Sequence, residues 1–422
     1  MQETSPKILH SLGAVIGGTA TGQAIAIASS PLITRIYGPE IFGLQGIFLG
    51  LLSIAMPLAA MRYPLAIVVA STESEAKALA KLSLIIGLSL ALFIGILLIG
   101  FREWLLVFLG VEALGSLVWF LPLAIFLVAV QDVCDQRSVR SNMFRLIGAV
   151  TAGQALITNF IRIGGGLIQP SAVVLIAASS LSYGFQAVFL SAFHRSRSES
   201  SSNVSVLDVF LKYKDFPLYR MPADLVSALS QTVPIFLLAI LFTPTVAGLY
   251  TLSRSVVNLP INIVGTAAGN VLYSRMAEYS KNKRPIFQFV LRLTLVQLIG
   301  PGAITGIAAL VFPSFFAFAF GETWRDAGEF AQWMSLWVIC MLVSIPTVRS
   351  LAVIGRQNLH LAFNLLLFVF GTFGMLCGYY YTGTDIGTVA IYSLVTSSIY
   401  VIQIIVYLDQ VRRFDRRNSM YV

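Results

Sequence analysis

The chain has 422 residues, of which 57% are hydrophobic and only 11% charged, and its mean hydropathy is +0.83. Soluble domains are about half apolar and about a quarter charged, so this composition excludes an ordinary soluble enzyme and indicates a membrane protein. The net charge of +9 does not indicate nucleic-acid binding, because the sequence leaves no extramembrane domain to carry a basic face.

Long apolar segments follow one another along the whole chain. A helix that spans a bilayer needs about 20 mostly apolar residues. We predict twelve spans, at 9–31, 43–69, 80–100, 114–133, 146–168, 171–192, 220–242, 246–272, 286–311, 329–348, 358–381 and 387–407. Each apolar run is continuous rather than alternating, which favours helices over a β-barrel. The predicted fold class is therefore an all-α polytopic membrane protein.

The first spans combine small and polar residues. In the first, "GGTATGQA" lacks the Lys-Ser/Thr ending of a phosphate loop. The pairs Gly13/Gly17 and Gly18/Gly22 instead predict close helix packing. Gln23 lies on a polar stripe of the same helix. The second span contains Arg62, roughly 9 Å from its middle at 1.5 Å per residue.

Polar stripes return in the seventh and eighth spans. Gln231 shares one face of the seventh span with Asp224, whose expected role is a local ion pair with Arg220 one turn away. In the eighth span, Arg254, Asn258 and Asn262 lie on one helix face. A stripe of this kind either forms hydrogen bonds that hold neighbouring helices together or lines a hydrated cavity.

Arg62 and Arg254 are the two arginines that the charge count assigns to neither side, and a charge inside a span is costly to bury. We interpret Arg254 as functional, because the asparagine stripe continues its face. Arg62 has a competing interpretation, in which its side chain extends to the lipid headgroups.

Positive charge fixes the expected orientation. With the N-terminus inside, 22 of the 28 Lys and Arg residues fall in cytoplasmic links. Four, Arg35, Arg102, Arg162 and Arg325, fall on the outer side. This bias predicts that both termini lie in the cytoplasm.

The two halves of the chain resemble each other. "FGLQGIFLGLLSIAMPL" recurs loosely as "AGLYTLSRSVVNLPI", "LGVEALGSLVWFLPL" as "FGETWRDAGEFAQWMSLW", and "SVRS" as "TVRS". Six spans per half give both halves the same orientation, which predicts a parallel repeat about an axis along the membrane normal. We predict two six-helix lobes, 1–192 and 217–422, joined by a cytoplasmic linker at 193–216.

Signals for catalysis or cofactors are missing. The residues His10, His194 and His360 lie far apart, and Cys134, Cys340 and Cys377 form no CxxC pair. The sequence therefore predicts neither a metal site nor a catalytic triad, and we expect no cofactor and no enzymatic activity.

Five motifs carry a family resemblance over nearly the whole chain. "SPLITRIYGPEIFG", "MRYPLAI", "YKDFPLYRMPADL", "SRSVVNLPINIVG" and "FGETWRDAGEF" resemble those of the Wzx-type oligosaccharide flippases. These form the polysaccharide-transport branch of the multidrug/oligosaccharidyl-lipid/polysaccharide (MOP) exporter superfamily. Pro64 departs from the acidic residue that many relatives carry after "RY", which puts an ion-coupled role at that position in doubt.

The resemblance implies a central cavity, alternating access, and movement of an undecaprenyl-pyrophosphate-linked oligosaccharide, such as an O-antigen unit, to the outer leaflet. Arg254 and Arg62 would face the phosphates, while Asn258, Asn262, Gln23 and Gln231 would bind sugar hydroxyls. The expected partners are this substrate, membrane lipids and, as a further candidate, the polysaccharide polymerase and chain-length machinery.

Two alternatives remain open from the sequence. A cation-driven drug exporter of the same superfamily would place carboxylates deep in its cavity, whereas the deepest predicted charges are basic. A membrane polymerase or ligase of polysaccharide assembly would form bonds rather than exchange leaflets.

Overall fold

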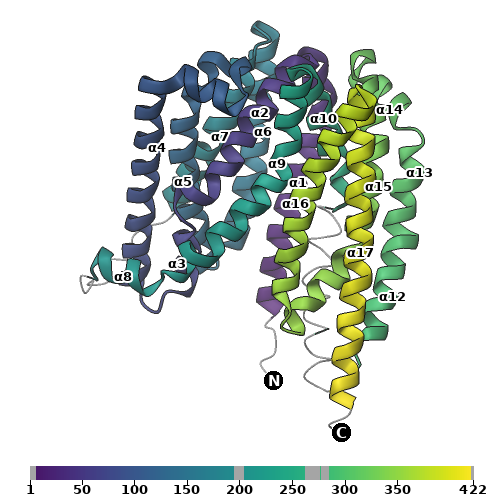
Figure 1. Ribbon diagram of the computed structural model, residues 1–422. Helices are drawn as coiled ribbons and strands as arrows, with labels where there is room; N and C mark the ends of the chain where they lie inside the picture. Colours follow the sequence, from purple (N-terminus) through teal and green to yellow (C-terminus); the bar gives the residue numbers. More distant parts are fainter. Residues whose placement is uncertain (1–5, 194–203, 262–275, 277–284, 420–422) are drawn as a thin grey trace. The chain divides into compact units, whose positions relative to one another are not determined.

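A computed structural model gives the fold, and it describes residues 6–193, 204–261, 276 and 285–419. Within these ranges the secondary structure is helical (Figure 1). The chain divides into two compact units, Met1–Thr232 and Val233–Val422. The boundary falls inside one helix, next to Pro234.

The first unit follows the predicted spans closely. Its helices begin at residues suited to helix starts, such as Pro39 at the first turn of the second helix. The elements are α1 (Pro6–Ile36), α2 (Pro39–Ala59), α3 (Tyr63–Val69), α4 (Glu73–Leu109), η1 (Glu112–Trp119), α5 (Phe120–Arg140), α6 (Phe144–Ile168), α7 (Ala172–Phe193), α8 (Val206–Lys212), η2 (Phe216–Arg220) and α9 (Met221–Leu241).

The second unit begins in the last part of α9. Pro244 opens its first complete helix, as Pro39 opens α2. The elements are α10 (Pro244–Val257), α12 (Phe287–Gln297), η3 (Leu298–Gly302), α13 (Ala303–Ala309), α14 (Phe312–Phe320), η4 (Glu322–Trp324), α15 (Arg325–Val353), α16 (Gln357–Thr382) and α17 (Asp385–Ser419).

Ten helices in the described part of the chain are long and apolar enough to cross a membrane. Their outer faces carry large apolar side chains, including Ile99, which is 77% exposed, and Phe160, which is 79% exposed. Exposed apolar surface of this extent fits lipid rather than water. The first predicted span coincides with α1, and the eighth begins on α10 and continues outside the described residues. The total of twelve stays a prediction.

The second predicted span, 43–69, is not one continuous helix. It breaks at Ala60–Arg62 into α2 and α3. Met61 and Arg62 have φ angles of 47° and 60°. Non-glycine residues rarely adopt this left-handed conformation, so one continuous helix was the wrong prediction here.

Helix α1 packs closely against α6 through glycine. A Cβ on Gly18 would collide with the backbone of Gly148, and one on Gly22 would lie 3.5 Å from the Thr151 carbonyl oxygen. The predicted Gly18/Gly22 packing face is therefore confirmed. A Cβ on Gly17 would meet nothing within 4 Å, so Gly17 does not belong to this face.

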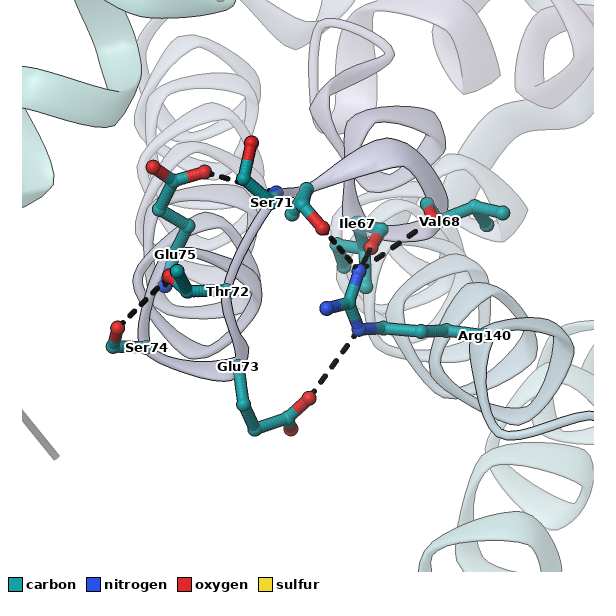
Figure 2. A network of polar contacts seen from close by, with 9 residues as sticks. Ile67, Val68, Ser71, Thr72, Glu73, Ser74, Glu75 and Arg140 are labelled. Carbon is teal, nitrogen blue, oxygen red and sulfur yellow. Dashed lines mark hydrogen bonds and ion pairs between the residues drawn. The ribbon is translucent and has the colours of Figure 1, made fainter. Parts of the chain in front are cut away.

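The turn between α3 and α4 is closed by local hydrogen bonds (Figure 2). The Thr72 hydroxyl accepts a bond from the backbone N–H of Glu75 at 3.2 Å. The Glu75 carboxylate in turn accepts one from the N–H of Ser71 at 3.2 Å. This arrangement resembles a capping box, although Glu75 reaches the N–H of the residue before the N-cap, and it satisfies N–H groups that have no partner inside the helix.

Arg140, the last residue of α5, holds the same turn from the other side (Figure 2). Its Nη1 donates to the carbonyl oxygens of Ile67 at 2.9 Å and Ala70 at 2.7 Å. Its Nε lies 3.3 Å from a carboxylate oxygen of Glu73. One guanidinium thus satisfies the carbonyl groups at the C-terminal end of α3 and ties α3, α4 and α5 together.

The end of the predicted linker is folded and packs against α4. Lys212 lies 2.6 Å from Glu75, and the Tyr213 hydroxyl lies 2.8 Å from the same carboxylate. The Tyr63 hydroxyl donates to the Phe210 carbonyl at 3.1 Å. The hydrogen bond to Glu75 raises the pKa of Lys212. Helix α8 is thereby fixed to the first unit.

Candidate functional site

Arg62 is surrounded by carboxylates rather than by lipid. Its Nε lies 2.8 Å from Oδ2 of Asp224 on α9, and its Nη1 lies 3.9 Å from Oδ2 of Asp132 on α5. The Nε–H does not point at the Asp224 oxygen, so this contact is a charge pair without hydrogen-bond geometry. About a quarter of the Arg62 side chain, 26%, is exposed.

Asp224 is shared between two cations. Besides Arg62, it lies 3.2 Å from Nε of Arg220, one helical turn earlier. The predicted local pair of Arg220 with Asp224 is therefore confirmed. Further along the same helix, the Gln231 amide donates to the Ser227 hydroxyl at 3.3 Å, as expected for one polar face.

Two aspartates on α5 add acidic groups beside the predicted basic residues. Asp132 lies beside Arg62, and Asp135 accepts hydrogen bonds from Gln186 at 2.9 Å and from Gln131 at 3.4 Å. Both residues lie in the second half of the helix Phe120–Arg140. The segment "VAVQDVCDQRSVR" contains both, but the predicted span ended at residue 133, so Asp135 fell outside it. That the deepest charges are basic stays a prediction.

Arg162 lies within α6, as the predicted span 146–168 implies, and its assignment to the outer side stays a prediction. Its Nη2 donates to the Ser179 hydroxyl at 3.0 Å, and Gln45 donates to the same oxygen at 2.9 Å. The Tyr37 hydroxyl donates to the Arg162 carbonyl at 2.7 Å. Tyr37, with no exposed surface, therefore has a packing role, and neutral groups surround this guanidinium.

In the second unit, Arg254 lies near the end of α10 among tyrosines. Its charge acts on Tyr250, Tyr392 and Tyr400. The neighbouring Ser253 is fully buried and donates to the Ala327 carbonyl at 2.6 Å, which fixes α10 to α15. Arg254 itself is half-buried. Arg254 is thus a cation that interacts electrostatically with neutral phenol groups on α10 and α17.

The remaining predicted residues are placed in part. The Asn258 N–H bonds to the Arg254 carbonyl at 3.1 Å, so these two residues are one turn apart, as predicted. Asn262 lies outside the described residues. Gln23 on α1 is exposed. Gln23, Arg62 and Gln231 belong to the first unit, and Arg254 and Asn258 to the second. Their common role in one site stays a prediction.

Two tryptophans of α15 differ in how far their side chains are exposed. Trp333 is 37% exposed and Trp337 only 8% exposed. Trp337 is therefore a packing residue. Across the described ranges, no group of three His, Cys, Asp or Glu side chains is arranged to hold a metal ion.

The family described as "Polysaccharide biosynthesis protein" matches residues 32–329, which is more than half of the chain. No curated protein sequence is significantly similar to this chain.

Solved structures share the fold over nearly the whole length. An inward-facing multidrug resistance MATE transporter of the MOP superfamily aligns with a TM-score of 0.71 and 14% identity, covering 95% of this chain and 99% of that one. The lipid II flippase MurJ in an inward closed conformation aligns at 0.70 and 13% identity, covering 96% and 90%. A MATE transporter of Vibrio cholerae aligns at 0.60 and 16% identity, covering 96% of each. At these identities the likeness establishes the fold.

Proposed function

The chain belongs to the family of polysaccharide biosynthesis proteins, and from this premise we propose that it is a flippase for a lipid-linked oligosaccharide. The cargo would be an oligosaccharide on undecaprenyl pyrophosphate, moved from the inner to the outer leaflet of the bacterial cytoplasmic membrane by alternating access. The fold shared with transporters and with a lipid II flippase supports transport rather than bond formation.

The observation that carries this proposal is Arg254. A guanidinium on an apolar helix is costly to hold in a bilayer, and such residues generally mark a substrate path. Its described neighbours include three tyrosines, whose hydroxyls are neutral at physiological pH. A pyrophosphate group would supply negative charge and several acceptor oxygens to this cation.

The sugar part of the cargo needs hydrogen-bonding partners when it leaves water. Asn258, next to Arg254 on the same face, is placed to provide one. We propose the same role for Asn262, Gln23 and Gln231. Arg62 becomes a weaker phosphate ligand in this scheme, because two carboxylates already compensate its charge.

A second candidate function, cation-coupled export of a small molecule, is favoured by Asp132 and Asp135 on α5. Carboxylates inside a span bind protons or cations in many transporters, and one fold match is a multidrug transporter. The two candidates differ in cargo. An exporter would protect cells from toxic compounds and would leave surface polysaccharide unchanged.

The test replaces Arg254 with Ala, Glu or Lys in a host that lacks its own copy of the gene. Surface polysaccharide, normalised to the abundance of the protein, should fall at least roughly tenfold for Arg254→Ala and Arg254→Glu, the effect of losing about 1.4 kcal/mol or more of binding. Arg254→Lys should keep part of the activity, since a point charge still pairs with phosphate.

The matched control is Arg325→Ala. Arg325 is half exposed and pairs with Glu322 on its own helix turn at 3.0 Å, so its loss should leave transport unchanged. In proteoliposomes, the lipid-linked oligosaccharide should become accessible to an impermeant glycosidase without any change in chain length. Longer chains would indicate a polymerase. Full transport by well-expressed Arg254→Ala would remove the proposal.

A further inference from the structure

We propose that Arg62 is an exchangeable ion-pair partner that moves between Asp224 and Asp132, and that this exchange fastens and releases the beginning of α9 during transport. We call the ion pair of Arg62 with Asp224 the latch. In the described state the latch is closed, because Arg62 lies 2.8 Å from Asp224 and 3.9 Å from Asp132. The proposal concerns conformation and does not depend on which cargo the protein carries.

The charges of the cluster allow both arrangements. It contains two cations, Arg62 and Arg220, and two anions, Asp132 and Asp224. When Arg62 leaves Asp224, the pair of Asp224 with Arg220 at 3.2 Å remains, and the existing 3.9 Å contact of Arg62 with Asp132 can shorten. Neither state leaves a charge without an opposite one, so the two states can be close in free energy.

Other charged groups near the cluster are already engaged. Asp135, one turn along α5 from Asp132, accepts hydrogen bonds from Gln186 and Gln131. Tyr183 interacts electrostatically with both Asp132 and Arg162, and Arg162 donates a hydrogen bond to Ser179. Among the described residues, Arg62 can therefore pair with either of two carboxylates, Asp224 or Asp132.

The backbone on both sides of the pair is suited to movement. Arg62 follows Met61 in a left-handed break between α2 and α3, which is a conformation that stores strain. On the other side, Asp224 lies one turn after the π-helical segment Phe216–Arg220. Helix α9 then crosses the boundary between the two units beside Pro234. A movement of Asp224 therefore moves the beginning of α9, the helix that continues from the first unit into the second.

The experiment measures backbone hydrogen exchange of the segment 216–232 in the purified full-length protein, without cargo. Asp224→Asn opens the latch and should raise the exchange rate about threefold to tenfold, the range expected for one partly exposed ion pair. Asp132→Asn removes the alternative partner, so the latch stays closed and exchange should fall by a similar factor. Each variant must elute as a single species on size exclusion.

A third variant keeps the test decisive if either of the first two misfolds. Arg220 is 62% exposed, so Arg220→Gln should fold normally. Without Arg220, Arg62 is the only described cation paired with Asp224, so the latch stays closed more of the time. Backbone hydrogen exchange of 216–232 should therefore fall, although an ion pair has been removed. The control is Asp409→Asn, which breaks the pair with Arg413 at 2.7 Å on α17 and should leave the segment unchanged.

Opposite signs for Asp224→Asn and Asp132→Asn support the exchange. A fixed structural cluster would raise exchange in both variants and in Arg220→Gln as well, and that result would overturn the latch. No change in Asp132→Asn would also overturn it, since Asp132 would then not compete for Arg62. Because no cargo is present, a failed latch is distinguishable from a failed flippase assignment.

Discussion

Replacing Arg140 with alanine should destabilise the first unit more than any other single arginine deletion at a helix end. The side chain is 22% exposed, and its Nη1 donates to the buried carbonyl oxygens of Ile67 and Ala70. In Arg140→Ala both oxygens lose a charged donor at the C-terminal end of α3. No neighbouring donor among the described contacts replaces it.

The magnitude follows from these two bonds. A hydrogen bond to a charged group contributes about 1.5–3 kcal/mol, so the two short bonds together contribute roughly 3–6 kcal/mol. Water reaches part of the site and compensates some of this loss, so we expect about 3 kcal/mol. For a unit of this size, about 1 kcal/mol corresponds to roughly 2–4 °C in Tm, which predicts a decrease of roughly 6–12 °C.

Glu73→Gln provides the comparison. It removes the ion pair of Arg140 at 3.3 Å, but Glu73 is 44% exposed. An exposed pair of this kind contributes about 1 kcal/mol or less, which is roughly 4 °C or less. The two variants therefore separate the carbonyl bonds from the ion pair.

The assay is thermal unfolding in detergent with a thiol-reactive fluorophore. The free cysteines Cys134, Cys340 and Cys377 are only partly exposed in the folded protein, so the fluorophore reports unfolding without any introduced cysteine. If Glu73→Gln lowers Tm as much as Arg140→Ala does, the ion pair and not the carbonyl bonds holds the turn. An unchanged Tm in Arg140→Ala would refute the reasoning altogether.

The remaining predictions concern helix packing and topology. Gly18→Ala should lower the Tm and the yield, with a loss of about 1–3 kcal/mol in the free energy of unfolding, because the new Cβ meets the backbone of Gly148. Gly17→Ala, one residue earlier, should be neutral. Equal effects of the two substitutions would show that α1 does not pack through this face. Reporter fusions at 137–145 and 412–417 should read as cytoplasmic and those near 325 and 384 as external, and a cytoplasmic reading near 325 would contradict the charge-based topology.

The sequence by itself determined where most of the long helices begin and end. The apolar runs at 146–168 and 171–192 match α6 and α7 within two residues. The physical reason is that a bilayer imposes one length and one polarity on every span, and both are local properties of the chain. Helix starts at Pro39 and Pro244, and the N-cap at Thr72, depend on a few adjacent residues in the same way.

The partners of the charged side chains were decided only by the tertiary structure. Arg62, Asp132 and Asp224 come from three helices far apart in sequence, and nothing in the spacing of one helix specifies the face that another presents to it. The same holds for Gly17 and Gly18, whose different surroundings depend on how α1 and α6 cross. The role of a charge inside a membrane helix depends on the side chains that neighbouring helices place beside it. Arg62 was therefore identifiable as unusual from the sequence, but its carboxylate neighbours were not.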